Sequence, residues 1–129
     1  MKGHLLDTNV ILIAPESPEM LSRAVQMAVL DGPNYLSVIS YWEVMLKSMK
    51  GNLIVGDPEI WWRDVLRELA AAPLHLLPHH VDAVSTLPSI HKDPFDRILI
   101  AQAIAEGLTL VTTDSEIPRY ASPDIQVIV

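Results

Sequence analysis

The sequence contains no cysteine and no long run of apolar residues. Without cysteine the chain has neither a disulfide nor a thiolate zinc site, and this absence favours no cellular compartment. The longest unbroken apolar run near the N-terminus, residues 10–14, is far too short to cross a membrane, and no signal-peptide core is visible. We therefore expect a cytoplasmic protein that has no membrane partner.

Basic residues are also scarce, with nine lysines and arginines against sixteen aspartates and glutamates and a formal net charge of −7. This charge argues against a protein that binds nucleic acid by bulk electrostatic attraction. It still permits an enzyme that meets phosphate through bound metal ions, because such ions reverse the local sign of charge. The acidic surplus also leaves room for a basic protein partner.

Two catalytic signatures are missing as well. The chain has no glycine-rich phosphate loop and no G-x-S-x-G motif, which excludes P-loop and serine-hydrolase chemistry. Hydrophobic residues make up 50% of the sequence and charged residues 19%, a balance that excludes a disordered chain. The sequence has no repeat, linker or low-complexity tract, so we expect residues 1–129 to form a single domain.

Short apolar segments alternate with helical patterns along the chain. Strands are predicted at residues 4–7, 35–39, 74–77, 109–112 and 125–129, and helices at 17–31, 40–51, 57–72, 79–87 and 94–106. A strand followed regularly by a helix is typical of a parallel sheet that is covered on both faces. The sequence therefore predicts the α/β class.

The best-marked helix is the one at residues 94–106. Asp93 is a good N-cap, Pro94 suits the first helical position, and Gly107 suits the residue just past the end. Asp96 then lies in the first turn, where an acid also stabilises the helix dipole.

Four acids fall at comparable points of the predicted sheet. Asp7 ends the first strand, Glu43 lies in the first turn after the second, Asp96 begins the long helix, and Asp114 ends the strand that follows it. Ligands of open α/β sheets bind beyond the carboxyl ends of the strands, so we expect these four side chains on one rim. Neighbouring carboxylates repel one another unless a proton or a cation intervenes, and oxygen ligands suit Mg²⁺ or Mn²⁺.

Each acid also has a structural alternative. Glu43 fits a capping box with Ser40 as the N-cap, and Asp114 is placed to cap the turn at Ser115. The weakest alternative is that of Asp7, because an acid at the end of a buried strand has no obvious partner.

Other polar residues are weaker candidates for the site than the four acids. Thr8, Asn9, Thr112 and Thr113 lie at the same rim, where they are able to orient a ligand carboxylate or a water. We interpret the other candidates as solvent-exposed: a surface turn for His79, His80 and Asp82, loop residues for His91 and Lys92, and a helix-surface ion pair with Glu43 for Lys47.

Several of these segments together resemble the PIN-domain family, and within it the VapC-type toxins of toxin–antitoxin pairs. The resemblance covers nearly the whole chain. It is carried by Leu6-Asp7-Thr8-Asn9, Ser40-Tyr41-Trp42-Glu43, His91-Lys92-Asp93-Pro94-Phe95-Asp96-Arg97 with the helix that follows, and Leu110-Val111-Thr112-Thr113-Asp114. The Asp-Pro-Phe-Asp-Arg segment is the most specific part.

The resemblance implies a three-layer α/β/α sandwich with a central parallel sheet, and a metal-dependent endoribonuclease. Its four-acid site matches Asp7, Glu43, Asp96 and Asp114, which would bind Mg²⁺ or Mn²⁺ and activate water for RNA cleavage, with Thr8, Asn9 and Thr112 as supporting groups. It also implies a homodimer and an inhibitory antitoxin, with DNA contacted only through that antitoxin.

Two alternatives to the nuclease remain. The first is a catalytically silent binding module of the same fold, which acts through an antitoxin and repressor complex. The second is a receiver-like phosphoacceptor domain, which is disfavoured because Asp7 stands alone at the first strand and the predicted third strand ends in Pro78.

Overall fold

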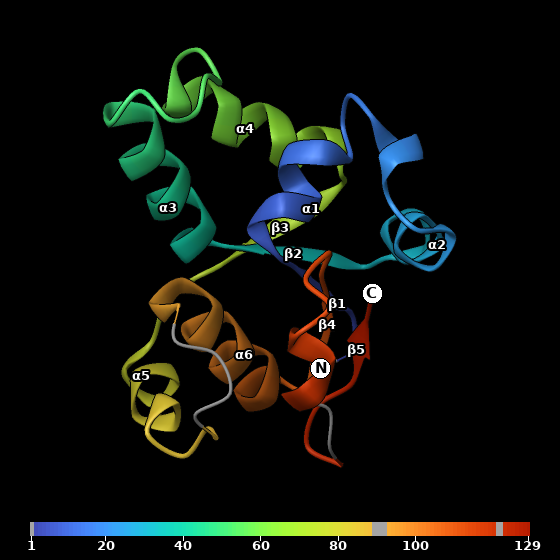
Figure 1. The fold of residues 1–129 in the computed structure, drawn as a ribbon, viewed down its shortest axis with the longest axis vertical. Coiled ribbons are helices and arrows are strands. Elements are labelled where there is room, and N and C mark those ends of the chain that lie inside the picture. The colour runs from blue at the N-terminus through green and yellow to red at the C-terminus, as the bar shows by residue number, and fades with distance from the viewer. Residues whose placement is uncertain (1, 89–92, 121–122) are drawn as a thin grey trace.

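The computed structural model describes residues 2–88, 93–120 and 123–129, and a five-stranded parallel sheet lies at its centre (Figure 1). The strands are β1 His4–Leu6, β2 Asn34–Ser37, β3 Ala71–Leu74, β4 Thr109–Val111 and β5 Val127–Ile128. Their order is β3-β2-β1-β4-β5, and every adjacent pair is parallel. Because β1 has β2 on one side and β4 on the other, the direction of sheet growth reverses between β1 and β4. This is the switch point at which α/β sheets usually bind ligands.

Helices cover both faces of this sheet (Figure 1). They are α1 Thr8–Ile13, α2 Arg23–Asp31, α3 Val38–Met49, α4 Pro58–Glu68, α5 Pro78–Val84 and α6 Pro94–Glu106, with short 3₁₀ helices η1 Pro18–Met20 and η2 Ile117–Tyr120. Residues of α1, α2 and α4 pack on one face, and residues of α5, α6 and η2 pack on the other. Helix α3 contacts α1, α4 and α6 and so joins the two sets. The predicted α/β sandwich with a central parallel sheet is confirmed.

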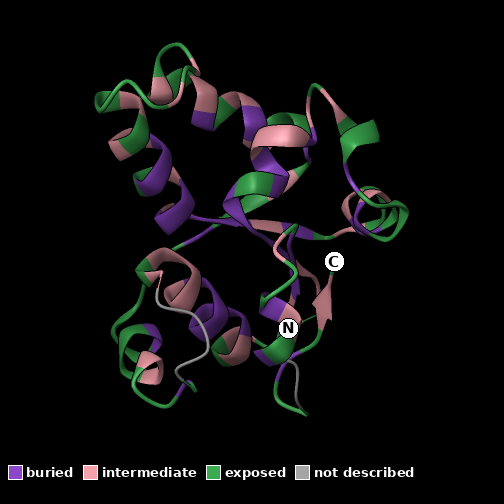
Figure 2. Cartoon of the chain, viewed as in Figure 1, coloured by how far each residue is buried: buried purple, intermediate pink, exposed green. Residues whose placement is uncertain are grey.

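The two faces are filled by alternate residues of the central strands. Leu5 and Leu110 point into the cluster with α5 and α6, whereas Leu6 and Val111 point into the cluster with α1, α2 and α4. All four are buried, and Figure 2 shows further buried residues in the helices on both sides of the sheet. A fully buried leucine contributes about 1.5–3 kcal/mol, so this two-sided core holds the strand ends, and the residues after them, in fixed positions.

Helix α6 has the ends that its sequence predicts. The Asp93 carboxylate accepts hydrogen bonds from the backbone N–H groups of Phe95 (2.8 Å) and Asp96 (3.3 Å). Pro94 occupies the first turn, and Gly107 takes the left-handed conformation with φ 66° just past the last helical residue.

Helix α3 begins three residues earlier than predicted. Ser37, the last residue of β2, is the N-cap, and its hydroxyl accepts from the N–H of Ile39 at 3.0 Å. The predicted capping box of Ser40 with Glu43 is therefore wrong, because both residues lie inside the helix and are buried. Ser37 is the last residue of β2 that pairs with β3, opposite Leu74, and the helix begins directly after it.

Two other predicted elements shift as well. The helix predicted at 17–31 is two pieces, η1 and α2, because Leu21 is extended between them and the Ser22 hydroxyl caps α2. The third strand lies three residues before its predicted position and includes Pro73. Proline lacks the N–H that a central strand needs, but β3 is an edge strand and tolerates it.

Within the described residues, no helix is both long enough and apolar enough to cross a membrane.

Candidate metal centre

All four predicted acids line one small pocket of about 110 Å³ at the carboxyl end of β1 and β4. Its lining residues, which we call the acidic pocket, are Asp7, Thr8, Asn9, Glu43, Lys47, Asp93, Asp96 and Asp114. A larger hollow of about 550 Å³ lies at the opposite rim, where β1 and β4 begin, and only one acid, Asp124, lines it. The acids thus gather at the rim where parallel sheets bind ligands.

Asp7 follows β1 directly and is 8% exposed. Its Oδ1 accepts from the N–H of Val10 at 3.1 Å and so caps α1, while its Oδ2 accepts from the Thr112 hydroxyl. Burial raises the pKa of Asp7, and the hydrogen bonds from Thr112 and Val10 oppose that shift. The expectation that Asp7 has no structural partner is wrong. The apolar, β-branched segment after Asp7 forms a helix that its pattern did not indicate.

Glu43 is buried in α3, and hydrogen bonds reach its carboxylate from two sides. The Thr8 hydroxyl donates to Oε1 at 2.7 Å, and the Lys47 ammonium donates to Oε2 at 2.9 Å. The hydroxyl of Ser40 lies 3.0 Å from the Thr8 hydroxyl and is hydrogen bonded to it. The predicted ion pair between Lys47 and Glu43 is confirmed, but it faces the acidic pocket. The hydrogen bond to Glu43 raises the pKa of Lys47, and the nearby charges of Asp93 and Asp96 add to this effect.

Asp114 and Asp96 reach the pocket from the other side of the switch point. Asp114 lies three residues after β4, its N–H donates to the Thr112 hydroxyl oxygen at 3.0 Å, and its Oδ1 accepts from the N–H of Glu116 at 2.8 Å. Asp96 lies in the first turn of α6 and is partly buried. Asp114 therefore caps a turn, as one alternative proposed, and lines the acidic pocket as well.

The supporting residues divide into three groups. Thr8 and Asn9 line the pocket, and Thr112 is buried behind it as the partner of Asp7. Thr113 is exposed and does not line the pocket. His91 and Lys92 lie outside the described residues. Sequence reasoning missed Asp93 as a pocket residue, because its evident role as the N-cap of α6 left no signal for a second one.

The chemistry of the pocket fits a hard divalent cation. Among the described residues, five carboxylates and one ammonium line it, so negative charge is in excess there even though burial favours the protonated form of Asp7. Oxygen atoms are the ligands that Mg²⁺ and Mn²⁺ prefer, and cysteine is absent from the chain. Thr8 and Thr112 donate to Glu43 and Asp7, which is how outer groups orient metal-binding carboxylates.

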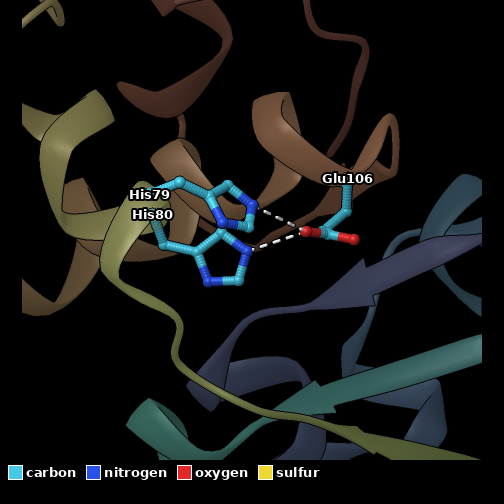
Figure 3. A group of neighbouring side chains, drawn as sticks. All are labelled: His79, His80 and Glu106. Atoms are coloured by element: carbon cyan, nitrogen blue, oxygen red, sulfur yellow. Dashed lines mark hydrogen bonds and ion pairs between the residues drawn. The ribbon is translucent and has the colours of Figure 1, made fainter.

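A second group of titratable side chains joins α5 to the end of α6, and we call it the histidine–glutamate cluster (Figure 3). Glu106 Oε2 lies 2.8 Å from His80 Nε2 and 3.3 Å from His79 Nε2. His80 is fully buried, so the interpretation of this segment as a surface turn is wrong for His80. Asp82 is exposed and takes no part in the cluster.

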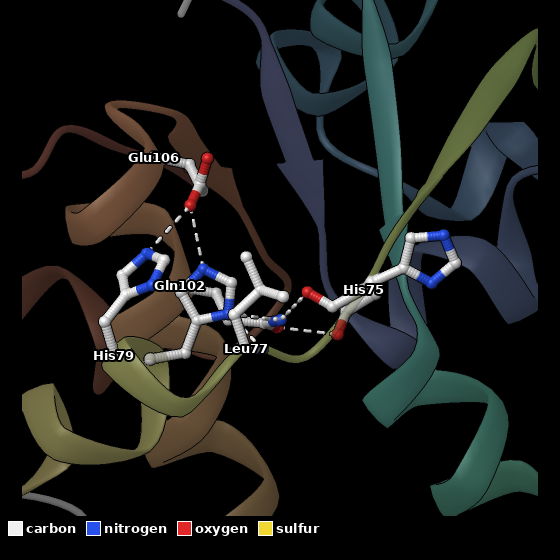
Figure 4. Close-up of polar contacts among 7 residues, drawn as sticks. His75, Leu77, His79, Gln102 and Glu106 are labelled. Carbon is white, nitrogen blue, oxygen red and sulfur yellow. Dashed lines mark hydrogen bonds and ion pairs between the residues drawn. The ribbon is translucent and has the colours of Figure 1, made fainter.

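The hydrogen bonds of the cluster assign its protons (Figure 4). The N–H of Leu77 donates to His80 Nδ1 at 3.0 Å, so the ring carries its proton on Nε2 and donates it to Glu106. This hydrogen bond is the main cause that lowers the pKa of Glu106. A metal on Nε2 would displace the proton to Nδ1, where it would face the N–H of Leu77. The cluster therefore fits a hydrogen-bonded contact between helices better than a metal site.

Fold and site together define a class: a parallel α/β domain with a pocket lined by carboxylates at the switch point of its sheet. The model of the PIN domain family matches residues 4–123. The chain belongs to the PIN domain family, which confirms the resemblance found in its sequence.

The chain is similar to ribonuclease VapC22 of Mycobacterium tuberculosis, with 27% identity over 121 residues and 92% of each protein covered. It is also similar in structure to a DNA-bound VapBC of Salmonella typhimurium, with a TM-score of 0.70, 18% identity, and 98% and 97% of the two chains covered. FitAcB of Neisseria gonorrhoeae gives a TM-score of 0.64 at 23% identity, with 98% and 96% covered. At these identities the solved structures establish the fold.

Proposed function

We propose that the protein is a metal-dependent endoribonuclease and the toxin of a toxin–antitoxin pair. The observation that carries this proposal is the meeting of Asp7, Glu43, Asp96 and Asp114 in one pocket from four separate parts of the chain. The similarity to a VapC ribonuclease over almost the whole length supports the reaction class. Residues 1–129 act as one domain, since both faces of the single sheet are already covered.

Each acid has a specific role in this proposal. Asp7, Asp96 and Asp114 hold the cation, and Glu43 completes the site or positions the attacking water. A bound Mg²⁺ or Mn²⁺ would supply an activated water and offset the charge that develops on the phosphodiester. Thr112 and Thr8 keep the carboxylates of Asp7 and Glu43 turned toward the pocket. Asn9, exposed at the rim, is placed to meet the RNA backbone.

The proposal includes protein partners. Several structural neighbours are toxin–antitoxin complexes, among them VapBC assemblies bound to DNA. We propose a cognate antitoxin for this chain, a homodimeric state, and contact with DNA only through the antitoxin. The net charge of −7 is complementary to a basic partner segment. An enzyme that cuts cellular RNA would act in the cytoplasm.

The test is cleavage of a mixed RNA pool by the purified protein in Mg²⁺ or Mn²⁺. An EDTA sample and an Asp96→Asn variant run beside it. We expect cleavage that requires the metal and is lost in the variant. Cleavage that persists in EDTA would contradict the proposal. A protein that neither cuts RNA nor binds Mn²⁺ would instead be the silent binding module of the antitoxin complex.

A further inference from the structure

Lys47 is the one cation among the described residues that line the acidic pocket. It lies one helical turn after Glu43 on α3, and its ammonium is 2.9 Å from Glu43 Oε2. The other oxygen, Oε1, accepts from the Thr8 hydroxyl at 2.7 Å. Both oxygens of this carboxylate are therefore engaged, one by a neutral hydroxyl and one by a full positive charge.

The two partners of Glu43 differ in freedom. Thr8 is buried and belongs to a helix that the Asp7 cap holds at its start. The side chain of Lys47 is 47% exposed, so its ammonium is able to leave Glu43 and remain at the pocket rim. A flexible lysine stem permits this movement without a change of backbone.

A divalent cation that enters the pocket meets the positive charge of Lys47 on Glu43, one of its proposed ligands. Like charges at this separation repel, so Lys47 opposes the cation as long as it stays on Glu43. A bound cation takes over Glu43 and offsets part of the negative charge of the pocket, so the phosphate of a bound RNA then competes with the remaining carboxylates, such as Asp93, for the ammonium. Lysine binds phosphate readily as a point charge.

We propose that the ammonium of Lys47 pairs with Glu43 in the metal-free pocket and transfers to an RNA phosphate when the divalent cation binds. This inference rests on the proposed nuclease function. Lys47 thereby lowers the affinity of the empty site for metal and raises the affinity of the metal-loaded site for RNA.

Calorimetric titration with Mn²⁺ tests whether Lys47 lowers the affinity of the empty site for metal. The variants are Lys47→Met, which keeps the stem and removes the charge, Lys47→Arg, which keeps the charge, and Lys50→Met, which removes an exposed charge from the same helix end. We expect Lys47→Met to bind Mn²⁺ about five- to tenfold tighter. The other two variants should match the unmodified protein.

Steady-state RNA cleavage at several salt concentrations tests whether Lys47 raises the affinity of the metal-loaded site for RNA. Lys47→Met should raise KM more than it lowers kcat, and the slope of log KM against log salt should fall by about 0.7, the value for one phosphate contact on a single strand. Unchanged KM with tighter Mn²⁺ binding would overturn the transfer to phosphate. Equal or weaker Mn²⁺ binding by Lys47→Met would overturn the inference while the nuclease stands. No Mn²⁺ binding by the unmodified protein would overturn the proposed function itself.

Discussion

The acidic pocket and the histidine–glutamate cluster both bring titratable side chains from separate helices together, yet they are built in opposite ways. In the pocket, the hydroxyls of Thr8 and Thr112 donate to carboxylates that still face a shared space. In the cluster, a histidine N–H fills the space in front of Glu106, and the backbone of Leu77 occupies the other ring nitrogen. The first group lines an open pocket, and the second forms a closed contact between two helices.

This contrast shows that proximity of possible ligands is a weak criterion for a metal site. The decisive property is whether the lone pairs remain available after the internal hydrogen bonds are made. The histidine–glutamate cluster satisfies its own hydrogen bonds and joins α5 to α6, whereas the acidic pocket is the proposed cation site. Each of the following experiments tests the distinction.

The largest expected effect is on catalysis. Asp7→Asn should lower metal-dependent RNA cleavage at least about a hundredfold, because it removes a charged ligand or the water orientation that depends on it. Glu106→Gln should leave cleavage within about twofold, since Glu106 does not line the pocket. A comparable loss in both variants would show that the cluster takes part in the chemistry.

The next effect is on stability. His80→Ala removes a fully buried ring and its hydrogen bonds to Leu77 and Glu106, so the free energy of unfolding should fall by about 2–4 kcal/mol. His79→Ala is the matched control, because His79 is exposed and its contact with Glu106 is longer. Urea unfolding measures both. Equal losses would mean that the buried contact does not carry the stability.

Without metal, the acidic pocket should lower the stability of the folded protein, whereas the histidine–glutamate cluster should not. Burial raises the pKa of Asp7 in the folded protein. At a pH above that pKa, the ionised carboxylate therefore destabilises the folded state relative to the unfolded state. Asp7→Asn should therefore raise Tm by a few degrees in EDTA at neutral pH, and the gain should shrink as the pH falls. Millimolar Mn²⁺ should raise the Tm of the unmodified protein and leave the variant unchanged. A lower Tm for the variant in EDTA would contradict this sign.

The smallest effect concerns Glu106. Its pKa is lowered in the folded state, so its carboxylate contributes stability above the ordinary glutamate range and loses that contribution as the pH falls through the folded-state pKa. Glu106→Gln should cost about 1 kcal/mol at neutral pH and nothing in strong acid. Glu19→Gln, at an exposed position, is the control for a simple change of charge. A cost that is independent of pH would point to packing instead of the ionised contact.

Local signals explain which parts of the fold the sequence predicts. Helix α6 has its N-cap, its first-turn proline and its terminal glycine within 15 residues, so the sequence predicts both of its ends. Asp7 and Asp114 were predictable because they follow strands whose carboxyl ends share one rim, and Asp96 because it lies at the marked start of α6. Ser40 begins the more complete local pattern, a capping box with Glu43, whereas the observed cap at Ser37 depends on the pairing of β2 with β3.

Long-range contacts explain the rest. The burial of His80 depends on the packing of α5 against α6 and on Glu106, which lies 26 residues away. The helix after Asp7 depends on the sheet and on α3, because its β-branched residues favour strands when considered alone. The order β3-β2-β1-β4-β5 is equally a property of tertiary packing.

The hydrogen bond between Asp7 and Thr112 joins residues that are 105 positions apart. A ribosome makes Asp7 among the first residues and Thr112 and Asp114 near the end, after strand β4. A nascent chain thus carries only Asp7 and Glu43 of the predicted ligands until Asp96 is added, and it lacks the strand that completes the pocket until β4 is made. Because β1 is central and waits for β4 on one side, the pocket cannot close during translation of the first hundred residues. The proposed nuclease would therefore be unable to cut the messenger RNA from which it is translated until almost all of the chain has emerged.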